Sequence, residues 1–365
     1  MSETVLEIHL ANLRHNYTFI RKQLSPTTKL LAVVKAFGYG SDAVEAAKCL
    51  VAQGVDYLGV AYVHEGVALR EAGITTPILV LHPQQPNLNA LIEHKLEPSV
   101  YGHRILDALL LTLKESNVSQ YPIHLKFNTG LNRLGFDPKN ALELGALLKQ
   151  NDQWLLLQGV YSHLAASDDV GEEAFTKTQL KNFAEIVNVF KPNYPKTNFH
   201  VLNTSGVLHF PEAQYNMVRT GISLYGYGNH PSVDAQLKPV LTLKTVISQI
   251  HTLNKGDTLG YNRAFVAKRR TKTATLPLGH ADGIGRIYGN GKGYVMINGQ
   301  QASILGNVCM DMIMVDVTAI DCQAGDTVIV IGPNASAENL ANAAGTISYE
   351  LITGLSQRIK RKVIS

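Results

Sequence analysis

The chain has 365 residues, 45% of them hydrophobic and 17% charged, an ordinary globular composition whose length suits two domains or one large domain with an extension. The net charge is only +4, and we expect the one short basic run, at residues 358–362, to be a solvated tail, so the charge gives no reason to expect a nucleic-acid partner. Three scattered cysteines are too few for a disulfide framework or a zinc site, and we expect no bound metal.

The first residues, MSETVLEIHL, contain no basic segment followed by an apolar one, so we expect no signal peptide. No apolar stretch approaches the length that is needed to span a bilayer. The sequence therefore predicts a soluble, cytoplasmic protein with no membrane partner.

Short apolar runs rich in β-branched residues recur along the first two-thirds of the chain, and eight of them are expected to be strands. They are residues 30–34, 55–60, 78–81, 97–100, 123–127, 157–162, 199–202 and 216–219. Helical patterns lie between them, for example at 43–53, 63–72, 140–149 and 178–190. This alternation predicts a (β/α)8 TIM-type barrel, and a doubly wound open sheet is the competing architecture.

Beyond about Tyr227 the pattern changes. The segment GNHPSVDAQLKP has the composition of a linker, with two prolines and several turn-forming residues. Alternating runs follow at 241–250, 273–278, 294–297, 302–305, 313–317 and 327–331, with Asn298-Gly299 as a two-residue hairpin turn, and the one plausible helix runs from Ser336 to about Ala344. We expect an α/β barrel domain at residues 1–230 and a mostly β C-terminal domain at 231–365.

Functional side chains of a barrel gather at the carboxyl ends of its strands. In this chain those ends carry Lys35, Lys126, His163 and Arg219, together with small polar residues after the last two strands. A lysine at the mouth of a barrel beside threonine, serine, glycine and arginine suits a phosphorylated aldehyde cofactor. A sugar-phosphate aldolase would fit the same residues.

Lys35 closes an apolar strand, where desolvation lowers the pKa of the amine and frees it for imine formation. A lysine that reaches into solvent from a strand end is the simpler interpretation. The next residues, Ala-Phe-Gly-Tyr-Gly, favour a functional role, because two glycines around Tyr39 let the backbone turn sharply and present a hydroxyl to a phosphate.

The segment Ala32-Val-Val-Lys35-Ala-Phe-Gly-Tyr39-Gly resembles the cofactor-lysine motif of bacterial alanine racemases. Other motifs of that family follow in the family's order over nearly the whole chain: Lys126-Phe-Asn-Thr-Gly-Leu-Asn-Arg133, Tyr161-Ser-His163, His200-Val-Leu-Asn203-Thr204-Ser205, Met217-Val-Arg219-Thr-Gly221-Ile222, Gly260-Tyr261-Asn262-Arg263, Ala281-Asp282-Gly283, Gly306-Asn-Val-Cys309-Met310-Asp311 and Tyr349-Glu350. One such motif is weak evidence, whereas the ordered set is strong evidence.

The resemblance implies a pyridoxal 5′-phosphate (PLP) racemase that interconverts L-alanine and D-alanine and supplies D-alanine for cell-wall peptidoglycan. It also implies a homodimer in which each active site combines the catalytic Lys35 of one subunit with the catalytic Tyr261 of the other. Two bases on opposite faces suit racemisation. A tyrosine with its ordinary pKa of about 10 is a poor base at neutral pH, so nearby cations must lower the pKa of Tyr261.

Arg219 is the most informative of the implied cofactor-binding residues. An arginine stays protonated, so the pyridine nitrogen that it contacts stays unprotonated, which suits reprotonation of the substrate carbon and disfavours transamination. The resemblance makes Arg133 the clamp for the substrate carboxylate and puts Met310 near the substrate. The other implied cofactor-binding residues are Lys35, Tyr39, His163, Asn203, Thr204, Gly221, Ile222 and Tyr349. Of these, Tyr39, Thr204, Tyr349 and the backbone amides of Gly221 and Ile222 are expected to hold the phosphate. In some family members the lysine that matches Lys126 is carbamylated, and the sequence leaves this open.

The chain departs from the family pattern at several positions. Phe37 and Gly38 stand where asparagine and alanine are usual, Asn262 where glycine is frequent, and His280 where a tyrosine lines the substrate entrance. None of these changes removes a group that does chemistry, but they leave the substrate range open.

A broader racemase that acts on serine or other amino acids is the close alternative. A PLP decarboxylase wants an acidic partner at the ring nitrogen, which Arg219 argues against. A non-catalytic PLP carrier would lack the β domain, and a cofactor-free aldolase would leave the Arg219-Thr-Gly-Ile motif unexplained.

Overall fold

The protein is described here from a computed structural model that covers residues 4–228 and 230–365; residues 1–3 and Asn229, which falls in the expected linker, lie outside the described residues. The chain divides into two compact units. We call Arg14–Gly38 with Ala43–Lys238 the barrel unit, and Met1–Leu13 with Tyr39–Asp42 and Pro239–Ser365 the β unit. The expected domain limits at 1–230 and 231–365 stay a prediction.

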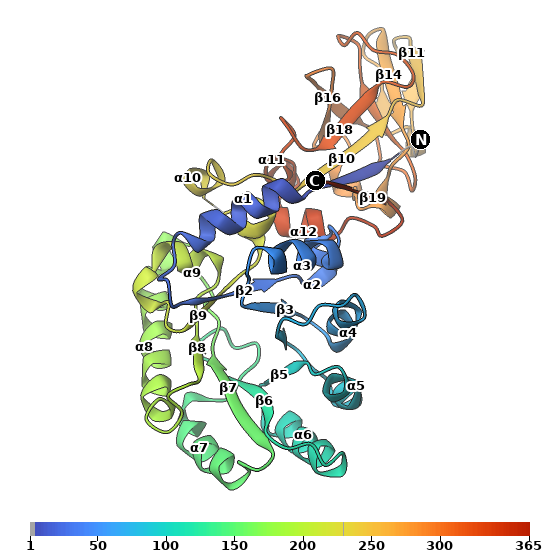
Figure 1. Ribbon diagram of the computed structural model, residues 1–365. Coiled ribbons are helices and arrows are strands. Elements are labelled where there is room, and N and C mark those ends of the chain that lie inside the picture. Colours follow the sequence, from blue (N-terminus) through green and yellow to red (C-terminus); the bar gives the residue numbers. More distant parts are fainter. Residues whose placement is uncertain (1–3, 229) are drawn as a thin grey trace. The chain divides into compact units, whose positions relative to one another are not determined.

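The barrel unit contains a parallel sheet of eight strands in the order β8-β7-β6-β5-β4-β3-β2-β9 (Figure 1). The strands are β2 (Lys29–Val33), β3 (Tyr57–Val60), β4 (Ile78–Val80), β5 (Glu97–Val100), β6 (Tyr121–Lys126), β7 (Leu155–Tyr161), β8 (Asn198–His200) and β9 (Met217–Thr220). The two end strands meet where the Arg219 amide donates a hydrogen bond to the Leu202 carbonyl over 3.1 Å. The prediction of eight strands in a barrel is confirmed, and the open sheet is wrong.

Helices follow the strands because each carries one apolar face that the sheet covers. They are α3 (Ala43–Ala52), α4 (Val63–Glu71), α5 (Leu88–Glu93), α6 (His103–Glu115), α7 (Ala141–Gln150), α8 (Glu173–Phe190) and α9 (Thr204–His209). In α6 the buried residues are Ile105, Leu106, Leu109, Leu110 and Leu113, which recur at helical spacing. The predicted helices are confirmed, although α8 begins at Glu173, before the predicted start at residue 178.

The β unit holds a nine-stranded sheet in the order β11-β14-β17-β16-β15-β18-β10-β1-β19. Its strands are β1 (Val5–His9), β10 (Leu241–Val246), β11 (Gln249–Leu253), β14 (Thr271–Leu276), β15 (Tyr294–Ile297), β16 (Gln300–Leu305), β17 (Ile313–Asp316), β18 (Thr327–Ile331) and β19 (Lys360–Ile364), and β12 (Thr258–Leu259) pairs with β13 (Phe265–Val266). Asn298 and Gly299 have φ of 49° and 77°, as a two-residue hairpin between β15 and β16 requires. The mostly β prediction and its hairpin are confirmed.

The basic tail is solvated, as expected, since Arg358, Lys360 and Lys362 are exposed. It also contributes to β19, an edge strand that pairs in parallel with β1, and lysines on an edge strand keep that edge from pairing with another chain. Other expectations about the β unit are wrong. The run at 241–250 is two strands, β10 and β11. The expected linker contains α10 (Pro231–Asp234), and a second helix, α12 (Ser348–Thr353), follows α11 (Ala337–Ala343). Among the described residues, no helix is long and apolar enough to cross a membrane.

Candidate active site

Lys35 lies directly after β2, as its position in the sequence predicts, and is the first residue of a short turn, α2 (Lys35–Tyr39). The side chain is half-buried. Burial lowers the pKa of the Lys35 amine, the charge of Arg133 lowers it further, and the charge of Glu65 opposes the shift. A lysine whose pKa is lowered has more of its amine in the neutral form, which is the nucleophile in imine formation.

The turn after Lys35 is left-handed. Ala36, Phe37, Gly38 and Tyr39 have φ of 52°, 55°, 63° and 53°. For an L-amino acid this conformation costs about 1–2 kcal/mol per residue, and only Gly38 is exempt. Strain of this kind persists where the surrounding structure imposes it, and it concentrates at functional sites.

Glu65 fixes the start of this strained turn. One carboxylate oxygen accepts a hydrogen bond from the Ala36 amide over 2.7 Å. The other accepts from the amides of Ala61 and Tyr62, over 2.6 and 3.0 Å. Because all three amides follow strand ends, Glu65 ties the loop after β2 to the loop after β3 and holds the backbone beside Lys35.

Five basic side chains of the barrel unit form what we call the cation cluster: Lys35, Lys126, Arg133, His163 and Arg219. Burial lowers the pKa of Lys126 to about 8, with further lowering by the charges of Arg133, Arg219 and Lys35. The pKa of His163 lies well below its usual range because of burial and the same neighbouring cations. Within the described residues, no member of the cluster forms an ion pair with a carboxylate. Such a cluster attracts anions such as phosphate and carboxylate.

Arg219, on β9, is 4% exposed and is held by neutral acceptors. Its Nη1 donates to Nδ1 and to the carbonyl of His200, over 2.7 and 3.1 Å. Its Nη2 donates to the Ser162 carbonyl over 2.7 Å and to Nδ1 of His163 over 3.2 Å. Burial lowers the pKa of Arg219 to about 10, so the group stays a cation at neutral pH. No described residue accepts from Nε, which leaves one N–H for a ligand.

The loops after β8 and β9 meet through small polar residues. Thr204 Oγ1 accepts a hydrogen bond from the Gly221 amide over 3.2 Å and lies 3.4 Å from Ser223 Oγ. Ile222 begins the short 3-10 helix η5 (Ile222–Tyr225) directly after Gly221. The structure thus brings together the hydroxyls and backbone amides that were expected to bind a phosphate. It adds Ser223, whose only signal in the sequence is its place next to the Gly221-Ile222 pair.

Asn203 has a structural task in the same loop. Its Oδ1 caps α9 by accepting from the Gly206 amide over 2.9 Å, and it also accepts from Ser167 Oγ over 2.8 Å. The side chain therefore holds Thr204 in place, and its contribution to ligand binding is expected to act through that residue.

Tyr39 and Tyr349 both belong to the β unit. Their ring centroids lie 6.2 Å apart, with the ring planes tilted by 52°. Burial, followed by the neighbouring Tyr349, raises the pKa of Tyr39, so its hydroxyl stays protonated and can donate a hydrogen bond. The two tyrosines that were expected to share a phosphate are neighbours within this unit.

Tyr261 starts a short turn, η6 (Tyr261–Arg263), and its side chain is 70% exposed. Gly260, Asn262 and Arg263 around it have φ of 73°, 60° and 52°. Asparagine is among the non-glycine residues that tolerate this conformation best, which explains how Asn262 can stand where the family often has glycine. The sharply turned backbone presents the tyrosine ring to solvent.

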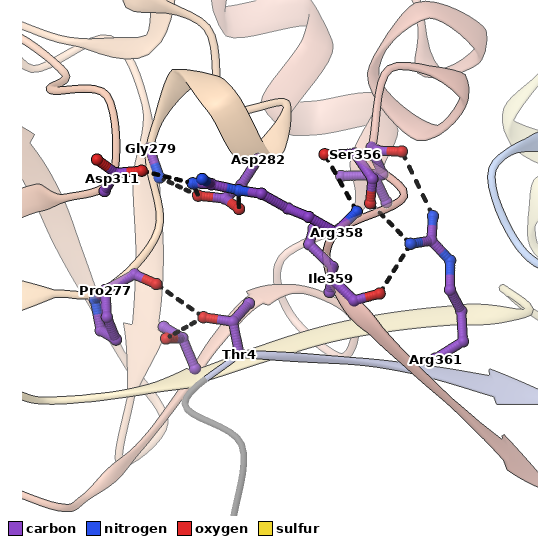
Figure 2. A network of polar contacts seen from close by, with 11 residues as sticks. Thr4, Pro277, Gly279, Asp282, Asp311, Ser356, Arg358, Ile359 and Arg361 are labelled. Atoms are coloured by element: carbon purple, nitrogen blue, oxygen red, sulfur yellow. Dashed lines mark hydrogen bonds and ion pairs between the residues drawn. The ribbon is translucent and has the colours of Figure 1, made fainter.

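Arg358 joins two segments of the β unit, one with Asp282 and one with Asp311 (Figure 2), and Met310 directly precedes Asp311 in the sequence. Arg358 donates to both carboxylate oxygens of Asp282, over 2.7 and 2.8 Å, and to Asp311 over 2.8 Å. We call these three residues the Arg358 bridge. Asp282 and Asp311 belong to sequence motifs given above, and Arg358 to the basic run at 358–362, but no role was predicted for any of the three.

Backbone contacts reinforce the Arg358 bridge. The amides of His280 and Ala281 donate to the carbonyls of Cys309 and Met310, each over 3.0 Å. A Cβ atom at Gly279 would lie 2.3 Å from the Cys309 carbonyl oxygen, so only glycine permits this approach. The exposed His280 and the 58% exposed Met310 are thus held beside each other at one surface of the β unit.

The residues of the barrel unit fit the expected cofactor. PLP carries an aldehyde, a phosphate and a pyridine nitrogen. The unit offers an amine whose pKa is lowered, a cation cluster without a paired acid, and an arginine Nε–H with no acceptor among the described residues. An acidic group at the ring nitrogen, as a decarboxylase of this architecture would want, is missing from the described contacts of Arg219.

Comparisons with known proteins agree with this fit. The family "Alanine racemase, N-terminal domain" matches residues 8–229, and "Alanine racemase, C-terminal domain" matches residues 240–363. The alanine racemase of Treponema denticola is 37% identical, over 99% of this chain and 98% of its own. A solved alanine racemase of Clostridium difficile 630 is 34% identical with a TM-score of 0.92, over 100% of this chain and 96% of its own. The alanine racemase of Bartonella henselae, solved with covalently bound pyridoxal phosphate, is 27% identical with a TM-score of 0.89 over the full length of both chains.

Proposed function

The chain belongs to the alanine racemase family, and from this premise we propose that Lys35 and Tyr261 are the two bases that exchange the α-proton of alanine. The protein is a PLP-dependent isomerase that interconverts L-alanine and D-alanine. The observation that carries the assignment of the barrel site is the cation cluster, in which Lys35 has a lowered pKa and no member forms an ion pair with a carboxylate of the described chain.

PLP, when bound, supplies the electron sink that makes the α-proton of the amino acid removable. Lys35 would hold its aldehyde carbon covalently, and Arg219 Nε–H would donate to its ring nitrogen. His163, whose Nδ1 accepts from Arg219, is neutral and therefore carries its hydrogen on Nε2. The phosphate would be held by Tyr39, Thr204, Tyr349 and the backbone amides of Gly221 and Ile222, with Asn203 keeping Thr204 in place.

Lys35 Nζ would take the α-proton on one face of the substrate. This role needs a neutral amine, and the lowered pKa of Lys35 supports it. Arg133 would bind the substrate carboxylate with its planar fork of donors. Its charge already lowers the pKa of both Lys35 and His163, which supports a location within the same cluster.

Tyr261 would serve the opposite face from the partner subunit of a homodimer, with Met310 beside it. Within one chain the Tyr261 side chain is 70% exposed and that of Met310 is 58% exposed, and large apolar groups at a surface support a protein interface there. Sedimentation of the purified protein tests the dimer, and a monomer with full activity would contradict it.

The function is tested by incubating the purified protein with L-alanine in deuterated buffer, with and without added PLP. Formation of D-alanine labelled at Cα, dependent on PLP, is the expected result. L-serine in a parallel reaction measures the substrate range, and a serine rate close to the alanine rate would favour the broader racemase. A bound cofactor band without any exchange at Cα would contradict racemisation.

The family also supports a biological role that the chain itself leaves untested. We propose that the enzyme works in the cytoplasm and supplies D-alanine for cell-wall peptidoglycan. Deletion of the gene is expected to make growth depend on added D-alanine. Unimpaired growth without D-alanine, in a strain that has no second racemase, would contradict this role.

A further inference from the structure

A chain of buried polar groups crosses the barrel unit and ends at Arg219. Glu97 on β5 is 8% exposed, and His124 on β6 and His200 on β8 are fully buried. His124 Nε2 lies 2.8 Å from Glu97 Oε2, and His124 Nδ1 lies 3.2 Å from His200 Nε2. His200 Nδ1 lies 2.7 Å from Arg219 Nη1. We call these four residues the Glu97 relay. Glu97 and His124 have no part in the function proposed above.

The two ends of the Glu97 relay fix every hydrogen in it. A guanidinium only donates, so Nδ1 of His200 must accept, and a neutral His200 then carries its hydrogen on Nε2. The Nε2 hydrogen of His200 is donated to Nδ1 of His124, so the hydrogen of a neutral His124 is on its Nε2. His124 Nε2 then donates this hydrogen to Glu97, because an ionised carboxylate only accepts. In a doubly protonated His124, the Nδ1 hydrogen would face the Nε2 hydrogen of His200, with no acceptor between them.

The fold makes room for this arrangement. Gly159, in the interior of β7, has no side chain where a Cβ atom would lie 2.0 Å from His124 Nδ1. Glycine weakens a strand, so its presence here marks a close approach. On the other side, the Tyr161 ring stacks on His200 with centroids 4.8 Å apart and planes 5° from parallel, and the same ring lies 5.0 Å from the Arg219 guanidinium.

Arg219 is a buried cation whose described contacts are all neutral, and a charge in that situation needs compensation. We infer that Glu97 is a positioning residue that supplies the counter-charge of Arg219 through His124 and His200. This inference rests on the proposed contact between Arg219 and the cofactor ring. The relay strengthens His200 Nδ1 as an acceptor and fixes the plane of the guanidinium, which leaves Nε–H directed at the ring nitrogen.

The separation between acid and arginine has a chemical use. A carboxylate in direct contact with Arg219 would occupy its donors and stand close enough to the ring nitrogen to favour a proton there. Two neutral imidazoles let a carboxylate balance the buried charge without entering the cofactor site. A buried carboxylate likewise fixes the tautomer and orientation of a histidine in many catalytic and metal sites without touching the ligand itself.

The variant Glu97→Gln tests the relay because its amide nitrogen can donate to His124 Nε2 and reverse the order of hydrogens. We expect kcat for alanine to fall by about ten-fold, the lower end for loss of an outer partner of a histidine in metal sites, with KM changed less than about two-fold. The absorbance spectrum of the bound cofactor should shift, because the donor at its ring nitrogen moves. An unchanged spectrum and kcat would overturn the inference. Absence of racemase activity in the wild-type enzyme would instead count against the proposed function.

Tyr57→Phe is the matched control, because the Tyr57 ring packs edge-on against His124, with centroids 6.0 Å apart, while its hydroxyl hydrogen-bonds Gln158, off the path to Arg219. It should lower stability while leaving the cofactor spectrum unchanged, and Glu97→Asp should recover part of the lost kcat. If Glu97→Gln does not fold, nitrogen NMR of the histidine rings in the wild-type holoenzyme decides the question. Hydrogens on Nε2 of both His124 and His200 are expected, and a hydrogen on Nδ1 of either ring would overturn the inference.

Discussion

Arg219 and Arg358 hold their guanidinium groups in opposite environments, one buried and one exposed. Arg219, in the barrel unit, is 4% exposed and contacts only neutral acceptors, with its acid two histidines away. Arg358, in the β unit, has a 48% exposed side chain and contacts Asp282 and Asp311 directly. The direct ion pairs raise the pKa of Arg358, whereas burial lowers that of Arg219.

The difference separates an arginine that binds a ligand from one that holds the fold. Nε and Nη2 of Arg358 donate to carboxylates that balance its charge directly, and these contacts fix the two loops that it joins. Arg219 keeps its charge and one N–H for an outside acceptor because no acid neutralises it directly. A paired acid therefore indicates a structural role, and its absence beside a buried arginine indicates a binding role.

The largest effect is expected from Lys35→Ala, which removes the reactive member of the cation cluster. The variant should lose covalent attachment of PLP and lower racemase activity on the order of a thousand-fold or more. Absorbance of the purified protein and the alanine assay measure both. Lys48→Ala, which changes an exposed lysine of the same unit, is the control and should retain both properties. A cofactor band that survives in Lys35→Ala would exclude Lys35 as the attachment point.

The second largest effect is expected from Tyr261→Phe, which changes the β unit and leaves the barrel unit intact. The variant should keep PLP, because no part of the cation cluster changes, while racemisation falls by about 10²–10⁴-fold, as for loss of a general base. In one direction, L to D or D to L, Tyr261 would remove the α-proton, and in the other direction it would return it. Hydrogen isotope effects at Cα, measured separately in the two directions, distinguish these steps. Tyr294→Phe in the same unit is the control. Full activity in Tyr261→Phe would refute the two-base assignment.

Arg219→Glu breaks the comparison directly by placing an acid where the barrel has none. Racemisation should fall by about a hundred-fold, and the fraction of turnovers that end in transamination should rise, because an acid favours a protonated ring nitrogen. Counting pyruvate formed per racemisation event measures the change. Arg219→Lys keeps the charge and should show less transamination than Arg219→Glu. Equal product ratios in all three proteins would contradict the role of Arg219.

Because Lys126 lies among other cations, its lowered pKa should make the free energy of unfolding depend on pH. Its pKa is about 8 in the folded protein and about 10.4 in an unfolded chain. Between these values the unfolded state binds more protons, so this group makes the free energy of unfolding rise as pH increases from about 8 to 10. Lys126→Met should be more stable at pH 7 and should flatten that rise, as measured by urea unfolding. The exposed Lys177→Met should leave the profile unchanged.

The smallest effects belong to the Arg358 bridge. Asp282→Ala should lower the free energy of unfolding by about 1 kcal/mol, since the nearly buried carboxylate also caps the Gly279 amide over 2.8 Å. Asp311, whose side chain is 55% exposed, should contribute less than about 0.5 kcal/mol when changed to alanine. PLP binding should not change in either variant. A larger loss for Asp311→Ala than for Asp282→Ala would contradict this ranking.

The barrel could be predicted from the sequence because its strands are buried on both faces and so appear as continuous apolar runs. β1 and β19 could not be placed, since their pairing joins opposite ends of the chain and the lysines of β19 hide an edge strand. The grouping of Arg219, His163 and Lys126 could be predicted, because all three lie at the carboxyl ends of barrel strands. Glu97 and His124 carry no such signal, because the burial of a glutamate before a proline appears only in the folded barrel.

The place of β1 in its sheet also bears on how the protein is made. β1 lies between β10 and β19, yet it is synthesised before the whole barrel, and both of its neighbours are synthesised after it. During synthesis the backbone donors and acceptors of β1 therefore lack their strand partners until the barrel has emerged from the ribosome. The barrel can mature early, whereas the nine-stranded sheet of the β unit, the unit to which Tyr261 belongs, is completed last. A nascent chain therefore gains its lysine site before its tyrosine site.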